Sequence, residues 1–140
     1  MDNLEINHMF EMGQLQGILL TLARPELTIY ANEKKHIGYE VRIRVIFRAN
    51  SMSFIENLND SLRAFHVEST IKERESKIRP KPMLRVSGIE NLRILCGLVP
   101  DKPDSKKQWK NFTLAVGIIF NGEHTTQEGL DELLKLKGEI

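Results

Sequence analysis

Arginine and lysine side chains recur at alternate positions in the middle of this 140-residue chain. In the segment YEVRIRVIFRA (39–49), Arg42 and Arg44 alternate with valine and isoleucine, which predicts a strand with one apolar face and one basic face. Later segments repeat the alternation with Lys72, Arg74, Lys81 and Arg85. Guanidinium and ammonium groups gathered on one surface can bind phosphate or another anion. The chemistry that these residues indicate first is recognition of an anionic partner.

The distribution of charge along the chain favours the same interpretation. The net charge is only +1, but residues 41–87 carry ten basic and five acidic side chains. Residues 1–40 carry three and six, and residues 88–140 carry seven and eight. A basic middle third indicates an anionic partner; a solvated sheet face of mixed charge is the alternative. No phosphate-binding glycine loop, nucleophile elbow or metal-ligand spacing is found in the sequence.

The cysteine content and the apolar segments bear on the compartment. The single cysteine, Cys96, excludes a disulfide within the chain and fits a reducing environment, and we interpret it as a small buried apolar residue. The uncharged run over residues 12–23 is too short to span a bilayer. It follows acidic residues, unlike a signal peptide. We therefore expect a cytoplasmic protein with no membrane partner.

The periodicity of apolar residues predicts five helices and four strands. Helices are expected over residues 6–23, 50–65, 89–99, 107–120 and 125–137, and strands over residues 26–33, 39–49, 66–76 and 81–89. Two strand pairs alternating with helices predict an α+β fold with a mostly antiparallel four-stranded sheet covered by helices on one face. We expect one domain over residues 1–140, with its core in residues 6–100 and additional helices in residues 101–140.

The uncovered face of that sheet is expected to carry the polar side chains. Alternation places on it Thr28, Tyr30, Arg42, Arg44, Thr70, Lys72, Arg74, Lys81 and Arg85, and the turns add Lys34, Lys35, Lys77 and Arg79. This set forms the candidate binding surface.

The first predicted helix contains two glycines within an otherwise apolar run, MGQLQGILLTLARP (12–25). Gly13 and Gly17 lie one turn apart on the same helix face. Each costs about 1 kcal/mol relative to alanine in a helix interior, so a packing benefit is the natural compensation. The benefit is either the close approach of a second helix or room for a core side chain of the same chain.

Several segments of the sequence resemble the LAGLIDADG homing-endonuclease family. Residues 15–23, LQGILLTLA, resemble its nine-residue signature at Leu15, Gly17, Ile18 and Leu19. The resemblance continues in IRVIFRANSMSFIENLNDSL, RVSGIENLRILCGLVP, KQWKNFTLAVGII and GEHTTQEGLDELLKLK, and spans residues 9–137. It implies a helix–strand–strand–helix–strand–strand–helix half-saddle with extra C-terminal helices. The closing glycine of the signature is replaced by Ala23.

The resemblance also implies how two such chains assemble and what they bind. In this family the signature helices pair at a two-fold axis, which implies a homodimer through the first helix, with Gly13, Gly17 and Leu20 at the interface. The two sheets then form a basic saddle over duplex DNA. On that saddle, strand arginines reach base edges such as guanine, and the lysines and arginines of the turns hold phosphates.

The two acidic positions of the signature fall on Leu20 and Leu22. The family holds catalytic Mg²⁺ with those acids, and leucine supplies no oxygen ligand. No catalytic or metal-binding residue is therefore expected, and Mg²⁺ is implied only if nuclease activity is retained. Glu26 is the alternative acid, and Lys106 or Lys107 corresponds to a basic residue that assists cleavage in some relatives.

Four functions remain open on the sequence. The first is a duplex-DNA-binding protein that has lost cleavage, for which regulation of transcription is a natural use. The second is an active, divergent endonuclease whose metal ligands come from Glu26 or a partner chain. The third is an RNA-binding maturase-like protein. The fourth is a protein–protein module whose basic sheet face is merely solvated.

Overall fold

The computed structural model describes residues 3–100 and 107–138 and has the expected α+β architecture. In chain order its elements are α1 (Asn3–Thr21), β1 (Arg24–Ala31), β2 (Tyr39–Arg48), α2 (Met52–Ala64), β3 (Thr70–Lys72), β4 (Met83–Val86), α3 (Ile89–Leu98), α4 (Lys107–Phe120), the 3₁₀ turn η1 (Glu123–Thr125) and α5 (Gln127–Lys137). Within those residues no helix is long and apolar enough to cross a membrane.

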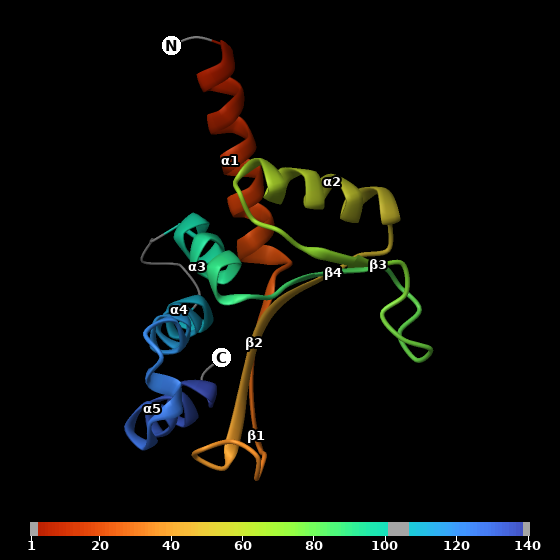
Figure 1. The fold of residues 1–140 in the computed structure, drawn as a ribbon. Helices are drawn as coiled ribbons and strands as arrows, with labels where there is room; N and C mark the ends of the chain where they lie inside the picture. The colour runs from red at the N-terminus through yellow and green to blue at the C-terminus, as the bar shows by residue number, and fades with distance from the viewer. Residues whose placement is uncertain (1–2, 101–106, 139–140) are drawn as a thin grey trace.

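The four strands form one antiparallel sheet in the order β1-β2-β4-β3. The long strand β2 pairs with β1 from Tyr39 to Ile46 and with β4 from Val45 to Arg48, so it connects the two hairpins. Figure 1 shows the β1–β2 turn and the loop between β3 and β4 pointing in different directions from this strand. Because β1 is an edge strand, it tolerates Pro25, which has no amide hydrogen to donate.

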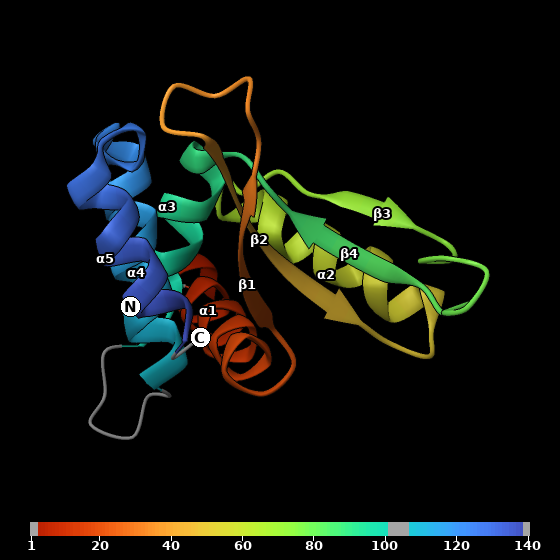
Figure 2. The same ribbon diagram turned by 90° about the horizontal axis from the view of Figure 1, so that it is seen from below.

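The helices cover one face of the sheet, as Figure 2 shows for α2 behind β2 and β4. Val45 and Phe47 of β2 pack with Leu15 and Leu19 of α1 in the main core cluster, which α2, α3 and α4 complete. Trp109 of α4 is buried there, and its indole N–H donates to the backbone carbonyl of Leu19 at 3.0 Å. This hydrogen bond and the surrounding packing join α4 to α1.

The third and fourth strands are shorter than the sequence predicts. The strand expected over residues 66–76 is wrong except at Thr70–Lys72, and the one expected over residues 81–89 is limited to Met83–Val86. His66 has a positive φ of 67° and closes the end of α2, so the chain is not yet extended there. Pro82 lacks an amide hydrogen, and Gly88 with a φ of 87° begins the turn into α3. Arg74 and Lys81 therefore lie outside the strands.

Candidate nucleic-acid interface

The sheet face opposite the helices, called here the open face, brings together residues from all four strands. Val41, Ile43, Val45 and Phe47 of β2 contact the core clusters, so the alternate side chains Arg42, Arg44 and Arg48 lie on the open face. The strand register places Thr28 opposite Arg42, Glu26 opposite Arg44, and both Ile46 and Thr70 opposite Arg85. The predicted gathering of basic residues is found here.

A shallow hollow of about 550 Å³ lies on the open face between β1, β2 and β4. Five of its lining residues were predicted for the binding surface: Thr28, Tyr30, Arg42, Arg44 and Arg85. Val41, Ile43 and Ser87 complete the lining. Three guanidinium groups and three hydroxyl groups thus border one open depression. Such a set can donate hydrogen bonds to phosphate oxygens or to the acceptors of a base edge.

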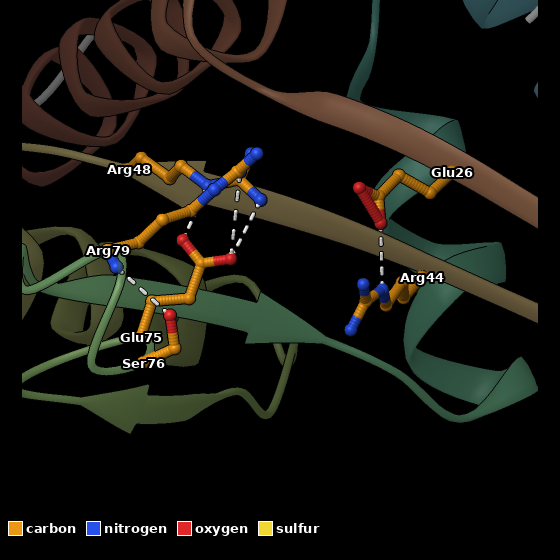
Figure 3. Close-up of polar contacts among 6 residues, drawn as sticks. All are labelled: Glu26, Arg44, Arg48, Glu75, Ser76 and Arg79. Carbon is orange, nitrogen blue, oxygen red and sulfur yellow. Dashed lines mark hydrogen bonds and ion pairs between the residues drawn. The ribbon is translucent and has the colours of Figure 1, made fainter.

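Three acidic side chains, which the sequence did not predict in this role, pair with the arginines of the open face. Arg44 Nε donates to Glu26 at 2.8 Å, and Arg42 Nε donates to Glu40 at 3.3 Å. Arg48 is bound by Glu75, which Figure 3 shows beside the Glu26–Arg44 pair. A cross-strand register for β1 and β2 would have revealed Glu26 opposite Arg44.

The arginines of the open face differ in which of their guanidinium nitrogens are engaged by the described residues. Arg44 donates to Glu26 through Nε alone, so its two terminal nitrogens make no hydrogen bond with the described residues, and its side chain is 43% exposed. Arg48 uses Nε and one terminal nitrogen against both oxygens of Glu75. The Nε of Arg85 is buried and has no hydrogen-bond partner in the described residues. Arg44 is thus presented for binding a ligand, whereas Arg48 is committed to an internal contact.

Tyr30, Glu40 and Arg42 form a polar cluster on the β1–β2 hairpin. The Tyr30 hydroxyl donates to Glu40, Asn32 Nδ2 donates to the same carboxylate oxygen at 3.1 Å, and the Arg42 guanidinium lies 5.2 Å from the Tyr30 ring centre. The hydrogen bond to Glu40 raises the pKa of Tyr30, and the same bond lowers the pKa of the Glu40 carboxyl. The carboxylate stays ionised and holds the ring and the arginine in place.

The remaining predicted cations lie around the edges of the open face. Lys34 and Lys35 are exposed in the β1–β2 turn, which Asn32 N closes by donating to Gly38 O at 2.8 Å. Lys72 is exposed on β3, the far edge strand. The loop that joins β3 to β4 carries four more exposed cations, Arg74, Lys77, Arg79 and Lys81. The hollow therefore has basic residues beyond it at both hairpin turns.

The exposed side of α1 carries the two glycines. A methyl group built on Gly13 or Gly17 would have no heavy-atom neighbour within 4 Å in the described chain. The explanation that a core side chain of the same chain needs this space is therefore wrong. Leu20, predicted at the same interface, is half-buried and packs against the core of its own chain. A groove of about 410 Å³ lies beside Gly17, between α1 and α2.

The C-terminal end of α1 carries leucine side chains, which supply no oxygen ligand for a divalent metal ion. Leu20 is half-buried, Leu22 is 42% exposed, and the Thr21 hydroxyl donates to the Gly17 carbonyl at 2.8 Å. These residues do not fit Mg²⁺, which prefers carboxylates and water. Glu26 faces Arg44 on the open face (Figure 3). In the described parts of the chain no group of three His, Cys, Asp or Glu residues could hold a metal, and Lys106 lies outside them.

A four-stranded antiparallel sheet with helices on one face and arginines on the other defines an α+β fold of two layers, one of helices and one of strands. Comparison with solved structures identifies the fold as that of the LAGLIDADG homing endonucleases, which confirms the predicted resemblance. The archaeal intron-encoded homing endonuclease I-Vdi141I, complexed with DNA, matches 94% of this chain and 82% of its own at 19% identity and a TM-score of 0.80.

Two further structures have the same fold. The homing endonuclease I-TnaI matches 92% of this chain and 86% of its own at 19% identity and a TM-score of 0.76. The LAGLIDADG homing endonuclease I-LtrWI, bound to target DNA, matches 92% of this chain but only 43% of its own length, at 18% identity and a TM-score of 0.77. No family model and no curated protein matches the chain.

Proposed function

We propose that this protein binds duplex DNA on the open face as a homodimer and does not cut it. The observation that carries the proposal is the hollow in which Arg42, Arg44 and Arg85 converge. Arginine donating to guanine is the commonest specific contact in the major groove. Structures with the same fold, I-Vdi141I and I-LtrWI, are described as bound to DNA, which supports the same partner here.

The geometry suggests a division of work on this surface. Arg44, held at Nε by Glu26, presents its terminal nitrogens as a fork suited to the two acceptors of guanine. The lysines of the β1–β2 turn and the cations of the β3–β4 loop lie beyond the hollow, where they can contact phosphates. The phosphate contacts would set the orientation of the protein on the duplex, and the residues of the hollow would recognise the base sequence.

Two observations support a homodimer. The chain matches 43% of the length of I-LtrWI, so one copy supplies less than half of that chain. The open space over Gly13 and Gly17 would allow a second α1 to approach closely. A two-fold pairing of α1 with itself then completes a second basic sheet face beside the first.

The residues at the end of α1 support the loss of cleavage. Leucines occupy the positions at which the signature has acids, and the nearest alternative, Glu26, is engaged by Arg44 at 2.8 Å. Recruiting Glu26 to a metal would break this ion pair. Phosphodiester hydrolysis through a metal needs the hard oxygen ligands that these leucines lack.

The test is a titration of random-sequence duplex DNA and of structured RNA, with Mg²⁺ and with EDTA. If about six cations neutralise phosphates, duplex affinity falls about 10³-fold between about 50 and 200 mM salt. Arg44→Gln should weaken binding, whereas Arg93→Gln, the same charge change on α3 where Arg93 lies over Phe120, should not. Mg²⁺-dependent cutting would refute the loss of cleavage, and salt-independent or absent binding would refute the DNA partner.

A further inference from the structure

The loop that joins β3 to β4, residues 73–82, is fastened to β2 by one carboxylate. Arg48 Nε donates to Glu75 Oε1 at 2.7 Å and Arg48 Nη2 donates to Glu75 Oε2 at 2.9 Å, a two-point contact that fixes both distance and orientation (Figure 3). Arg79 of the same loop approaches the carboxylate at 3.9 Å. Only 18% of the Glu75 side chain and 27% of the Arg48 side chain are exposed.

The rest of the loop is a small turn with little apolar anchorage. Glu75 N donates to Lys81 O at 3.1 Å, and Ser76 accepts from and donates to Arg79 at 3.0 Å through its hydroxyl and its amide. Ala49 N donates to Pro82 O at 3.3 Å, next to Arg48. Ile78, the loop's large aliphatic residue, is 92% exposed and contributes no packing. The placement of the turn at the edge of the open face therefore depends on the Arg48–Glu75 contact.

We infer that Glu75 is a positioning residue for DNA binding: through Arg48 it holds the β3–β4 loop where Lys77, Arg79 and Lys81 meet the phosphate backbone. The inference rests on the proposed function. The negative charge of Glu75 would by itself repel DNA phosphates, whereas in this role Glu75 strengthens DNA binding. Arg48, consumed by this contact, serves as an anchor and not as a reader of bases.

Neutralising Glu75 changes the affinity for DNA in opposite directions depending on whether this acid repels phosphate or positions the loop. A carboxylate that merely lies on a DNA-binding surface repels phosphate, so neutralising it strengthens binding. A carboxylate that positions three cations weakens binding when it is neutralised. Glu73 provides the matched control, because it is exposed in the same loop and makes no hydrogen bond or ion pair with the described residues.

The experiment compares Glu75→Gln, Glu73→Gln and Arg48→Lys with the unaltered protein. Arg48→Lys keeps the charge and removes the two-point geometry. In the free protein, we expect hydrogen exchange at the amides of Glu75, Ser76 and Arg79 to quicken about tenfold in E75Q and R48K, since hydrogen bonds to charged groups contribute at least that much. Exchange in E73Q should be unchanged.

On duplex DNA at low salt, we expect E75Q and R48K to bind about five- to tenfold more weakly, with the slope of log K against log salt reduced by about 1 to 2. E73Q should bind as tightly as the unaltered protein or more tightly. Equal tightening by E75Q and E73Q, or unchanged exchange in E75Q, would overturn the inference. Absence of DNA binding by the unaltered protein would refute the proposed function, while the exchange comparison would still decide whether Glu75 tethers the loop.

Discussion

Replacing Gly13 and Gly17 with alanine would distinguish their effect on the stability of a single chain from their effect on the association of two chains. Both lie inside α1, and an added methyl group meets nothing within 4 Å in the described chain. Alanine is favoured over glycine in a helix by about 1 kcal/mol, so the double variant should stabilise an isolated chain by about 2 kcal/mol. For a chain of this size that corresponds to a rise in Tm of about 6 to 8 °C.

The effect on association should have the opposite sign. If α1 pairs with a second α1 across these glycines, the added methyl groups enter a closely packed seam, and overpacking of the whole seam costs about 1 to 3 kcal/mol. The dimer should then dissociate at concentrations about 10- to 100-fold higher than in the unaltered protein, because about 1.4 kcal/mol changes an equilibrium tenfold. Sedimentation velocity over a concentration series measures this, and urea unfolding at low concentration measures the gain in the single chain.

Gly117→Ala on α4 is the matched control, since its added methyl group also meets nothing within 4 Å. It should stabilise the chain by about 1 kcal/mol and leave association unchanged. The reasoning is refuted if the Gly13 and Gly17 variants associate as tightly as the unaltered protein. It is refuted equally if the unaltered protein is a monomer at every concentration.

Two further perturbations test contacts elsewhere in the structure. Glu40→Gln removes the charged acceptor that raises the pKa of Tyr30, so an ultraviolet titration should show this phenol ionising at lower pH. The stabilisation by this hydrogen bond is present below the phenol's ordinary pKa of about 10 and is lost as the pH rises through the raised value. Trp109→Phe leaves the buried Leu19 carbonyl without its donor and should cost about 1 to 3 kcal/mol in urea unfolding. An unchanged titration or unfolding midpoint would contradict the corresponding contact.

Most of the fold could be predicted because its elements have strong local signals. Strand β2 runs from Tyr39 to Arg48, one residue short of the prediction, since its alternation of apolar and basic residues is nearly complete. The helix expected over residues 107–120 has these bounds in the structure. Strand β3 was overestimated because alternation alone does not detect the positive φ at His66 or the turn that begins after Lys72.

The candidate site was predictable in its cations and not in its acids. Arg42, Arg44 and Arg85 could be assigned to one face by alternation within each strand. The partners Glu26 and Glu75 depend on which residues of other segments lie opposite, and that requires the register of β1 and the path of the β3–β4 loop. The open Cβ positions of Gly13 and Gly17 likewise required coordinates, because spacing cannot distinguish an internal neighbour from an external one.

The acid–arginine pairs lower the net positive charge of the open face and fix the orientation of its arginines. Ion pairs at or near the surface contribute only about 0 to 1 kcal/mol each, so the Glu26–Arg44 and Glu40–Arg42 pairs add little to the stability of the fold. On the function proposed above, the carboxylates offset part of the positive charge of the open face, which would weaken its sequence-independent attraction to DNA. They also hold Arg42 and Arg44 in defined orientations, so less side-chain freedom is lost on binding. If the open face binds DNA as proposed, this arrangement would reduce its general affinity for DNA and favour discrimination between base sequences.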